Sequence, residues 1–155
     1  MQPRIKSPAF TVPGTREALL GISRATEECG VPRATLELVA VRAGQINGCS
    51  VCVDMHCRAL KKMGESDARI FSIGTWREAP YYTDAERAAL ALTEASTRLS
   101  SEADAVPDRV WEEAARHFSE KALAGLVTAI ALANFWNRLN VPTRQPTGEF
   151  VAQYI

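Results

Sequence analysis

The sequence predicts an all-α protein built as one domain. No stretch of the 155 residues shows the sustained alternation of apolar and polar residues that is typical of strands, whereas several segments carry signals for helix starts and ends. Apolar residues make up 46% of the chain, which is ordinary for a globular domain of this size. We therefore expect a single domain over residues 1–155, with a helical core over about 15–145 and flexible or extended arms at both ends.

Punctuating residues divide the first half of the chain into helices. Thr15 can cap a helix that Gly30 ends, and Pro32 suits the first turn of a helix that reaches Asn47 and Gly48. With the later signals, we predict helices over residues 15–29, 32–47, 49–63, 66–73, 83–100, 107–118 and 119–140.

Capping signals support the later helices. Gly64 is placed to end the third helix. Thr83 and Glu86 have the spacing of a capping box, and Ser119 can cap a long apolar helix. The tail over residues 141–155 contains two prolines, so we predict that it is an extended arm.

Two of the predicted segments, 34–43 and 122–133, are apolar nearly all round. Helices of this kind are buried, either in a large core or between subunits. A monomer of this length has limited room for two of them, so we expect a homo-oligomer. A compact monomeric bundle with both helices at its centre is the alternative.

The charge balance, the apolar runs and the N-terminal residues indicate which kinds of partner and which location to expect. Lys plus Arg and Asp plus Glu each number 18, and no region is strongly basic, which argues against a nucleic-acid surface. Polar residues interrupt every apolar run before the ~20 residues of a membrane span, and the first residues lack the apolar core of a signal peptide. We therefore expect a cytoplasmic protein with no nucleic-acid or membrane partner. In that compartment a close cysteine pair is more often catalytic or metal-binding than structural.

The segment from Cys49 to His56 carries the candidate chemistry. Spacings of three and four residues place Cys49, Cys52 and His56 on one face of a helix, and cysteines three apart fall within the ~4.4–6.8 Å between Cα atoms that a disulfide tolerates. Gly48 lets the helix begin there, so we expect both sulfur atoms in the first turn, where free N–H groups and the helix dipole favour thiolates. His56, one turn after Cys52, can accept the thiol proton.

Glu37 lies on the preceding predicted helix in apolar company that includes Ala34, Leu38 and Val41. A buried carboxylate is costly unless it is paired or protonated, and burial raises its pKa towards the range that is useful for proton transfer. The spacing equally permits an ordinary ion pair with Arg33 one turn before. From the spacing alone both interpretations stay open.

Glu37, Cys49, Cys52 and His56 together match the pattern E-x11-C-x2-C-x3-H without a gap. The pattern resembles the signature of the AhpD-like alkylhydroperoxidases, within the carboxymuconolactone decarboxylase superfamily. The segments TWREAPYYTDAERAALALTEASTRL and ALANFWNRLN also resemble the downstream helices of that family, so the resemblance covers about residues 15–145. It implies an AhpD-like helical bundle that assembles as a trimer or hexamer and uses no metal or flavin cofactor.

The resemblance also implies a role for each residue. In the family the second cysteine attacks a hydroperoxide and becomes a sulfenic acid, the first condenses with it to a disulfide, and a dithiol or lipoyl-type reductant protein reduces that disulfide. Carried over, Cys52 is peroxidatic, Cys49 is resolving, and His56 with Glu37 forms the proton relay. The best-known peroxidases of the family have a histidine directly before the second cysteine, where this chain has Val51. We therefore expect a slow peroxidase.

Three other functions compete with this one. The cysteine pair and His56 could provide three ligands of a zinc site. The fourth ligand could be His117, Cys57 or Glu37. Structural zinc sites usually draw their second ligand pair from a separate CxxC or HxxxH, which the sequence lacks. A decarboxylase acting on a lactone, as in the same superfamily, would not need the cysteine pair, and a non-catalytic helical scaffold would need none of these residues. Cys29 is predicted to be a small buried residue, and Cys57 to point away from the pair.

Overall fold

The computed structural model describes residues 2–100 and 103–148, and these contain helices and no strand, which confirms the all-α prediction. The elements are α1 (Pro8–Thr11), α2 (Thr15–Glu27), α3 (Arg33–Asn47), α4 (Ser50–Lys62), α5 (Asp67–Phe71), the 3₁₀ helix η1 (Ser72–Thr75), α6 (Asp84–Thr97), α7 (Asp108–His117) and α8 (Glu120–Thr143).

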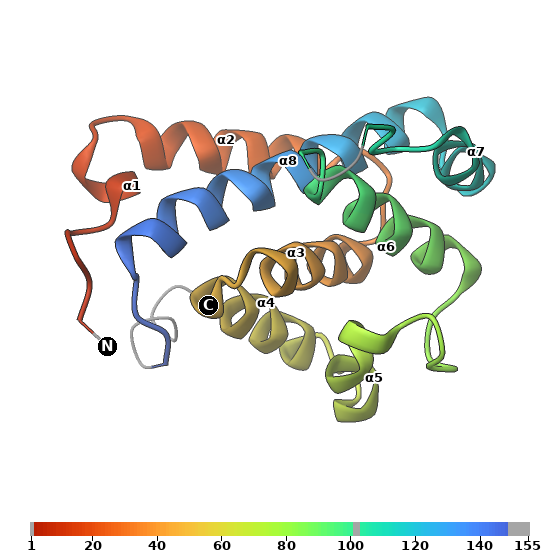
Figure 1. Cartoon of the computed structure of the whole chain (residues 1–155), viewed down its shortest axis with the longest axis horizontal. Helices are drawn as coiled ribbons and strands as arrows, with labels where there is room; N and C mark the ends of the chain where they lie inside the picture. The colour runs from red at the N-terminus through yellow and green to blue at the C-terminus, as the bar shows by residue number, and fades with distance from the viewer. Residues whose placement is uncertain (1, 101–102, 149–155) are drawn as a thin grey trace.

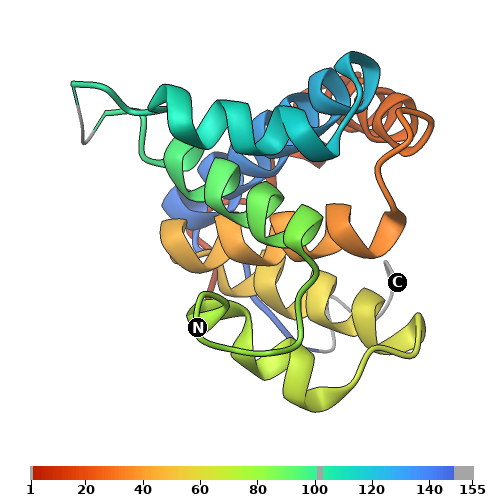
Figure 2. The ribbon, with the colours of Figure 1, turned by 90° about the vertical axis from the view of Figure 1, so that its right-hand side faces the viewer.

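The helices pack around α3. This helix contacts α4, α6 and α8, and α2 in turn contacts α8. In Figures 1 and 2, α3 and α6 lie between α2 and α8 on one side and α4 and α5 on the other, with α7 beside the outer end of α6. The junction of α3 and α4 lies beside the last turns of α8, with Gly48 and Ser50 exposed and the two cysteines buried.

The apolar character of α3 is explained by its two buried faces. Leu36 and Val39 belong to a core cluster shared with α6, α7 and α8, whereas Leu38 and Val41 belong to a second cluster with α4, α5 and η1. Burial of such an aliphatic side chain stabilises the fold by about 1.5–3 kcal/mol. The prediction that segment 34–43 is buried is confirmed.

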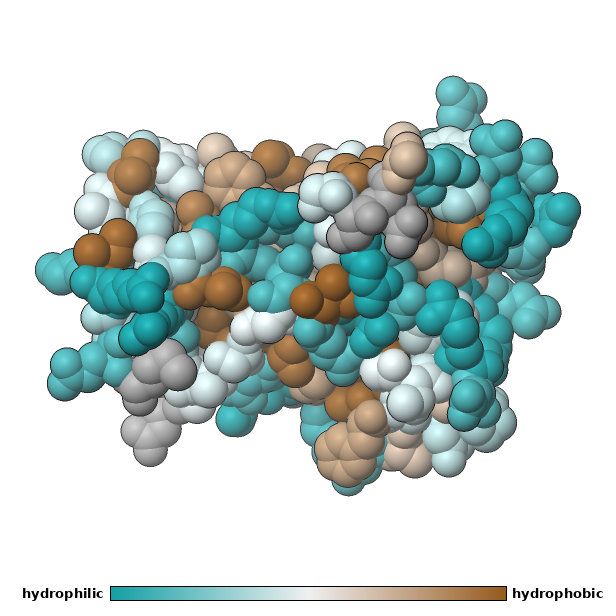
Figure 3. Space-filling view, in the orientation of Figure 1, coloured by the Kyte–Doolittle hydropathy of each residue, from teal (hydrophilic) through white to brown (hydrophobic). Residues whose placement is uncertain are grey.

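The second apolar helix is buried on one side only. Leu126 and Ile130 of α8 are inaccessible, but Val127, Phe135 and Val141 are exposed. Of the described helices, α8 alone is long and apolar enough to cross a membrane. Its most apolar 18-residue window has a mean hydropathy of 1.2, and 33% of that window is buried. It packs against α2, α3 and α6, as a core helix does. On the face shown in Figure 3, hydrophobic patches are small and are separated by hydrophilic side chains.

The capping signals of the later helices are confirmed, but the cap predicted for Thr15 is wrong, because Thr15 is the first residue of α2 and its side chain makes no capping hydrogen bond. The Thr83 hydroxyl and the Glu86 carboxylate form a complete capping box at the start of α6, and the Ser119 side chain accepts a hydrogen bond from the backbone N–H of Ala122 at the start of α8. Three predicted helices have other bounds than expected: α2 ends at Glu27 rather than near residue 29, segment 66–73 divides into α5 and η1, and α6 ends at Thr97 rather than near residue 100.

Both terminal arms differ from the prediction. The first contains the short helix α1, which begins with Pro8 in the position that favours proline. At the other end α8 continues through Pro142 to Thr143, because a proline in the last turn removes only one helix hydrogen bond. The chain then returns to α4, where Thr147 Oγ1 and the N–H of Gly148 donate to Asp54. Residues 149–155 of the predicted arm lie outside the described residues.

Candidate active site

The turn between α3 and α4 places the cysteines. Gly48 ends α3 in the left-handed conformation at φ 71°, which glycine adopts without strain. Cys49 is the N-cap of α4, and its Sγ accepts a hydrogen bond from the N–H of Cys52 at 3.3 Å. Only Cys52 therefore lies in the first turn, which corrects the prediction that both do.

Cys49 and Cys52 are joined by a disulfide in this structure. Their Cα atoms are 5.3 Å apart, and the side chains are almost fully buried, with 2% and 3% of their surface exposed. The spacing argument for a bond between these two residues is confirmed. Cys29, which is buried, and Cys57, which is partly buried, are free thiols.

Glu37 and His56 form the second pair of the site. Glu37 from α3 is 6% exposed, and its Oε2 lies 2.6 Å from Nδ1 of His56 on α4. The other oxygen accepts a hydrogen bond from Nε of Arg33 at 3.0 Å. The ion pair with Arg33 and the pairing with His56 therefore both occur, since each carboxylate oxygen of Glu37 has its own partner.

The pKa of Glu37 moves in the opposite direction to the prediction. Burial raises it, but the hydrogen bonds and positive charges of His56 and Arg33 outweigh burial, so the pKa lies below its ordinary value of 4.5. The expected rise is wrong because the sequence did not reveal that both partners would contact the carboxylate at once. Glu37 is thus ionised at neutral pH and holds Nδ1 of His56, which leaves Nε2 as the ring nitrogen that can exchange a proton.

Cys52, His56 and Glu37 line one cavity of about 270 Å³. Most of its remaining wall is apolar and comes from Leu20, Leu36, Ala40, Met55, Leu132 and Trp136. Cys49 instead lines a separate groove, together with Gly44, Val53 and Cys57. The disulfide thus lies between two openings, with one sulfur-bearing residue at each.

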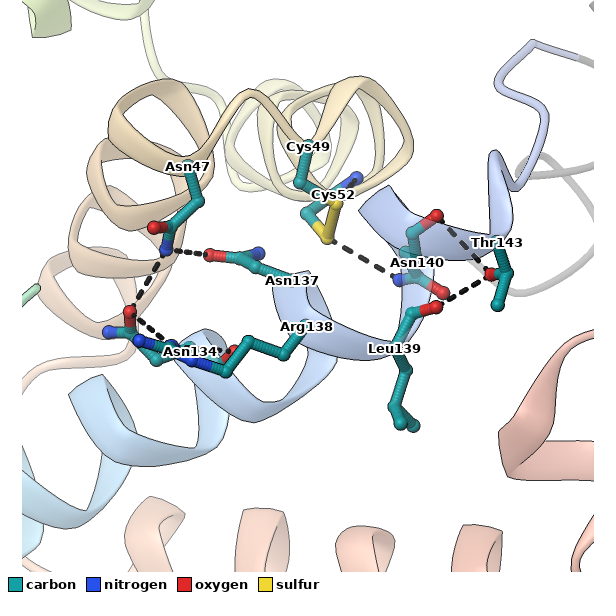
Figure 4. The surroundings of a disulfide bond; sticks show 9 residues. All are labelled: Asn47, Cys49, Cys52, Asn134, Asn137, Arg138, Leu139, Asn140 and Thr143. Atoms are coloured by element: carbon teal, nitrogen blue, oxygen red, sulfur yellow. Dashed lines mark hydrogen bonds between the residues drawn. A yellow bond between two sulfur atoms is a disulfide. The ribbon is translucent and has the colours of Figure 1, made fainter.

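Asparagines of α8 complete the surroundings of the disulfide (Figure 4). Asn140 Nδ2 donates to Sγ of Cys52 at 3.5 Å. Asn47, at the end of α3, donates through Nδ2 to Oδ1 of Asn134 at 2.9 Å and of Asn137 at 2.8 Å. The sequence analysis missed these residues. The available signal was the three-residue spacing of Asn134, Asn137 and Asn140 within a largely apolar helix, which places the three amides on one side.

The zinc alternative finds little support in this geometry. The sulfur atoms of Cys49 and Cys52 are bonded to each other, whereas a zinc ligand must be a thiolate. His117 lies at the end of α7 and contacts Glu113. Among the described residues no group of three or more His, Cys, Asp or Glu side chains is placed to hold a metal ion.

The comparisons with known proteins agree with this geometry. Residues 13–95 match the model of the carboxymuconolactone decarboxylase family. This segment is more than half of the sequence and contains all four predicted site residues. The chain belongs to the carboxymuconolactone decarboxylase family. The chain is also 34% identical over 129 residues to the uncharacterized protein YdfG of Bacillus subtilis strain 168, a match that covers 83% of the chain and 86% of YdfG.

Other relatives extend the comparison. The uncharacterized protein YnjA of Escherichia coli strain K12 is 34% identical over 104 residues, which are 66% of this chain and 55% of YnjA. The crystal structure of ATU0492 from Agrobacterium tumefaciens superposes with a TM-score of 0.87 at 32% identity, over 95% of this chain and 99% of that one. ATU0492 is described as a protein of unknown function, suggested to be the antioxidant defence protein AhpD. The AhpD-like fold is thus confirmed.

The same fold occurs in a debrominase. The debrominase Bmp8 superposes with TM-scores of 0.75 without ligand and 0.76 in a complex of a cysteine-to-alanine variant with 2,3,4-tribromopyrrole. These structures are 21% and 20% identical to this chain, which covers about three quarters of Bmp8. At this identity the likeness concerns the fold alone.

Proposed function

We propose that this protein is a thiol-dependent peroxidase that cycles the Cys49–Cys52 disulfide. The observation that carries the proposal is the position of Cys52, which is half of a disulfide and lines the same cavity as the hydrogen-bonded pair of Glu37 and His56. A nucleophile, a base and a group that orients the base are the parts that covalent catalysis requires.

In the proposed reaction, His56 accepts the thiol proton of reduced Cys52 through Nε2, while Glu37 holds Nδ1. The thiolate attacks the terminal oxygen of a hydroperoxide, so that an S–O bond forms and the O–O bond breaks. Sulfur is oxidised by two electrons, the peroxide is reduced by two, and the leaving alkoxide takes the proton from His56 to become an alcohol. The thiol of Cys49 then attacks the sulfenic acid of Cys52, the disulfide forms and water leaves.

The roles of the two cysteines follow from the openings that they line. The substrate cavity contains Cys52, which makes this residue the peroxidatic cysteine in our proposal. The hydrogen bond from Asn140 to its sulfur would also stabilise a thiolate there. Cys49 lines the separate groove, through which an external dithiol or lipoyl-type reductant protein would attack its sulfur. Sulfur carries both electrons, so the cycle needs no resident metal or flavin.

We further propose that the enzyme works as a homo-oligomer, a trimer or hexamer, in the cytoplasm. The exposed apolar side chains Val127, Phe135 and Val141 of α8 support an assembly, because burial between subunits would remove them from water. A cytoplasmic location suits a cysteine pair that must be reduced again after each turnover.

The test is a count of thiols after oxidation. The fully reduced protein has four cysteines and should lose two thiols on addition of one equivalent of cumene hydroperoxide. The Cys52→Ser variant should lose none, whereas Cys49→Ser should form a sulfenic acid that dimedone traps. Cys57→Ser is the matched control, because Cys57 is on the same helix but outside the cavity, and it should react as the wild type does.

Other outcomes separate the alternatives. Full turnover by Cys52→Ser together with loss of the first oxidation in Cys49→Ser would invert the two roles. Resistance of the reduced wild type to every hydroperoxide would contradict the proposal. Stoichiometric zinc in that resistant protein would then favour the metal site, and conversion of a lactone would favour the decarboxylase.

A further inference from the structure

Asn137 differs from the other amides around the disulfide because half of its side chain has no partner. The residue is 1% exposed, and its Oδ1 accepts the hydrogen bond from Asn47. Its Nδ2 is buried and makes no hydrogen bond within the part of the chain that the structure describes. A buried donor without an acceptor destabilises the folded state, so such a group is unusual unless another molecule supplies the acceptor.

The position of this free donor indicates which molecule that is. Asn137 lines the same cavity as Cys52 and His56. It lies one turn before Asn140, whose own amide donates to the sulfur of Cys52. In Figure 4 the side chain of Asn137 extends from α8 to a position between Asn47 and the disulfide, with its oxygen towards Asn47. An acceptor atom of a ligand close to Cys52 would therefore meet the Nδ2 group.

The orientation of the amide is fixed by its neighbours. Nδ2 of Asn47 donates to the oxygens of both Asn134 and Asn137, so the oxygen of Asn137 must face Asn47 and the NH₂ group is turned away from it. Asn134 is fixed in turn, because its Nδ2 donates to Thr97 and to the carbonyl of Ile130. A donor that is held in place before the substrate arrives stabilises a developing negative charge without a cost of reorganisation.

We propose that Asn137 is a catalytic residue that donates a hydrogen bond to the leaving oxygen of an organic hydroperoxide; this inference rests on the proposed peroxidase function. When the thiolate of Cys52 attacks the terminal oxygen, the O–O bond breaks and charge accumulates on the oxygen attached to carbon. Nδ2 of Asn137 stabilises this alkoxide until His56 protonates it. Asn47 is the positioning residue for this donor.

The cavity also indicates the size of the carbon group. Its volume of about 270 Å³ is equivalent to about nine water molecules, and its wall is mainly aliphatic and aromatic. It therefore suits a hydroperoxide with a compact apolar substituent, such as cumene or tert-butyl hydroperoxide, better than hydrogen peroxide, which has no apolar part to bury.

The test compares leaving groups. We would measure the rate of Cys52 oxidation in Asn137→Leu, which has a similar shape and no amide, with tert-butyl hydroperoxide, cumene hydroperoxide and peracetic acid. Loss of one such donor typically costs about 10²–10³-fold, so we expect a loss of about 10²-fold with tert-butyl hydroperoxide, whose alkoxide is the poorest leaving group. The loss should be much smaller with peracetic acid, which releases a stable carboxylate. A plot of log rate against the pKa of the leaving alcohol or acid should therefore be steeper in the variant.

Two controls separate this role from a structural one. Thr128→Val removes a polar group from the exposed side of the same helix, outside the cavity and away from the asparagine network, so its slope should equal that of the wild type. Reaction of Cys52 with 4,4′-dithiodipyridine, which releases no oxygen leaving group, should proceed at the wild-type rate in Asn137→Leu. If that variant does not fold, Asn137→Ala replaces it in both assays.

The outcomes distinguish the inference from the function on which it rests. An unchanged slope in the Asn137 variant, or an equal loss with peroxides and with dithiodipyridine, would overturn the role of Asn137 while the wild type remains a peroxidase. A wild-type protein that no hydroperoxide oxidises would overturn the peroxidase function and the assignment together.

Discussion

Replacement of Glu94 by glutamine should remove a large, pH-dependent part of the stability of the bundle. Glu94 of α6 is 5% exposed, and one of its oxygens accepts hydrogen bonds from Arg42 Nε on α3 at 2.8 Å and from Trp76 Nε1 at 2.9 Å. The other accepts from Arg77 at 2.8 Å. The carboxylate thus ties the helix that carries Glu37 to α6 and to the segment after η1.

The magnitude follows from the pKa of Glu94. Burial raises this pKa, but the hydrogen bonds and charges of Trp76, Arg77 and Arg42 outweigh burial and lower it from 4.5 to about 2. At about 1.4 kcal/mol per tenfold change in proton affinity, this difference corresponds to about 3 kcal/mol of folding free energy. Because the pKa is lower in the folded state, the stabilisation is complete above pH 4.5 and is lost as the pH falls towards 2.

Urea unfolding followed by far-UV circular dichroism, at intervals between pH 7 and pH 2, measures this effect. At pH 7 the free energy of unfolding of Glu94→Gln should be about 3 kcal/mol below that of the wild type, and the two proteins should converge towards pH 2. Glu113→Gln is the control, because Glu113 is on the surface of α7 and its removal should change little. A Glu94→Gln variant as stable as the wild type at pH 7, or a difference that does not depend on pH, would refute the reasoning.

Three further predictions concern the relay, the assembly and the core. Val51→His should raise the rate of Cys52 oxidation by cumene hydroperoxide by about tenfold, most strongly near neutral pH where imidazole titrates; no change would mean that this position is not part of the relay. Sedimentation at micromolar concentration should give a mass several times 16.9 kDa, and a monomer would contradict the proposed assembly. Gly125→Ala should destabilise the protein by about 1–3 kcal/mol in urea unfolding, because the new Cβ would lie 2.1 Å from Cβ of Cys29. Gly21→Ala, whose Cβ meets nothing closer than 3.9 Å, should be neutral or stabilising, and equal effects of the two changes would contradict this packing argument.

Local signals were sufficient where the physical cause is local. The capping box of Thr83 and Glu86 and the glycine at position 48 act through backbone groups a few residues away, so the sequence predicted the ends of these helices correctly. The spacing of Cys49 and Cys52 predicted their bond for the same reason. The start of the predicted arm was wrong, because α8 continues through residues 141–143, and a proline near a helix end does not by itself show whether the last turn forms.

Properties that depend on contacts between residues far apart in the chain could not be predicted from the sequence. The apolar surroundings of Glu37 predicted burial and a raised pKa, but the direction is set by His56 and Arg33, which contact the carboxylate together. The asparagines of α8 lie about 90 residues from Asn47 in the chain, and nothing local pairs them. A free amide such as Nδ2 of Asn137 becomes visible only when every neighbouring group has been placed.

The sequence by itself determined the helical class of this protein, because helix periodicity and caps are properties of short segments. The cysteine pair within one turn, together with the resemblance to the family pattern, indicated the four residues of the candidate site. The tertiary structure decided which groups meet those residues. The packing of α8 against the junction of α3 and α4 separates the surroundings of Cys52 from those of Cys49 and supplies the amides around the sulfur. Hydrogen bonds and charge interactions act over a few ångströms in space whatever the separation in the chain, so only the folded structure reveals them.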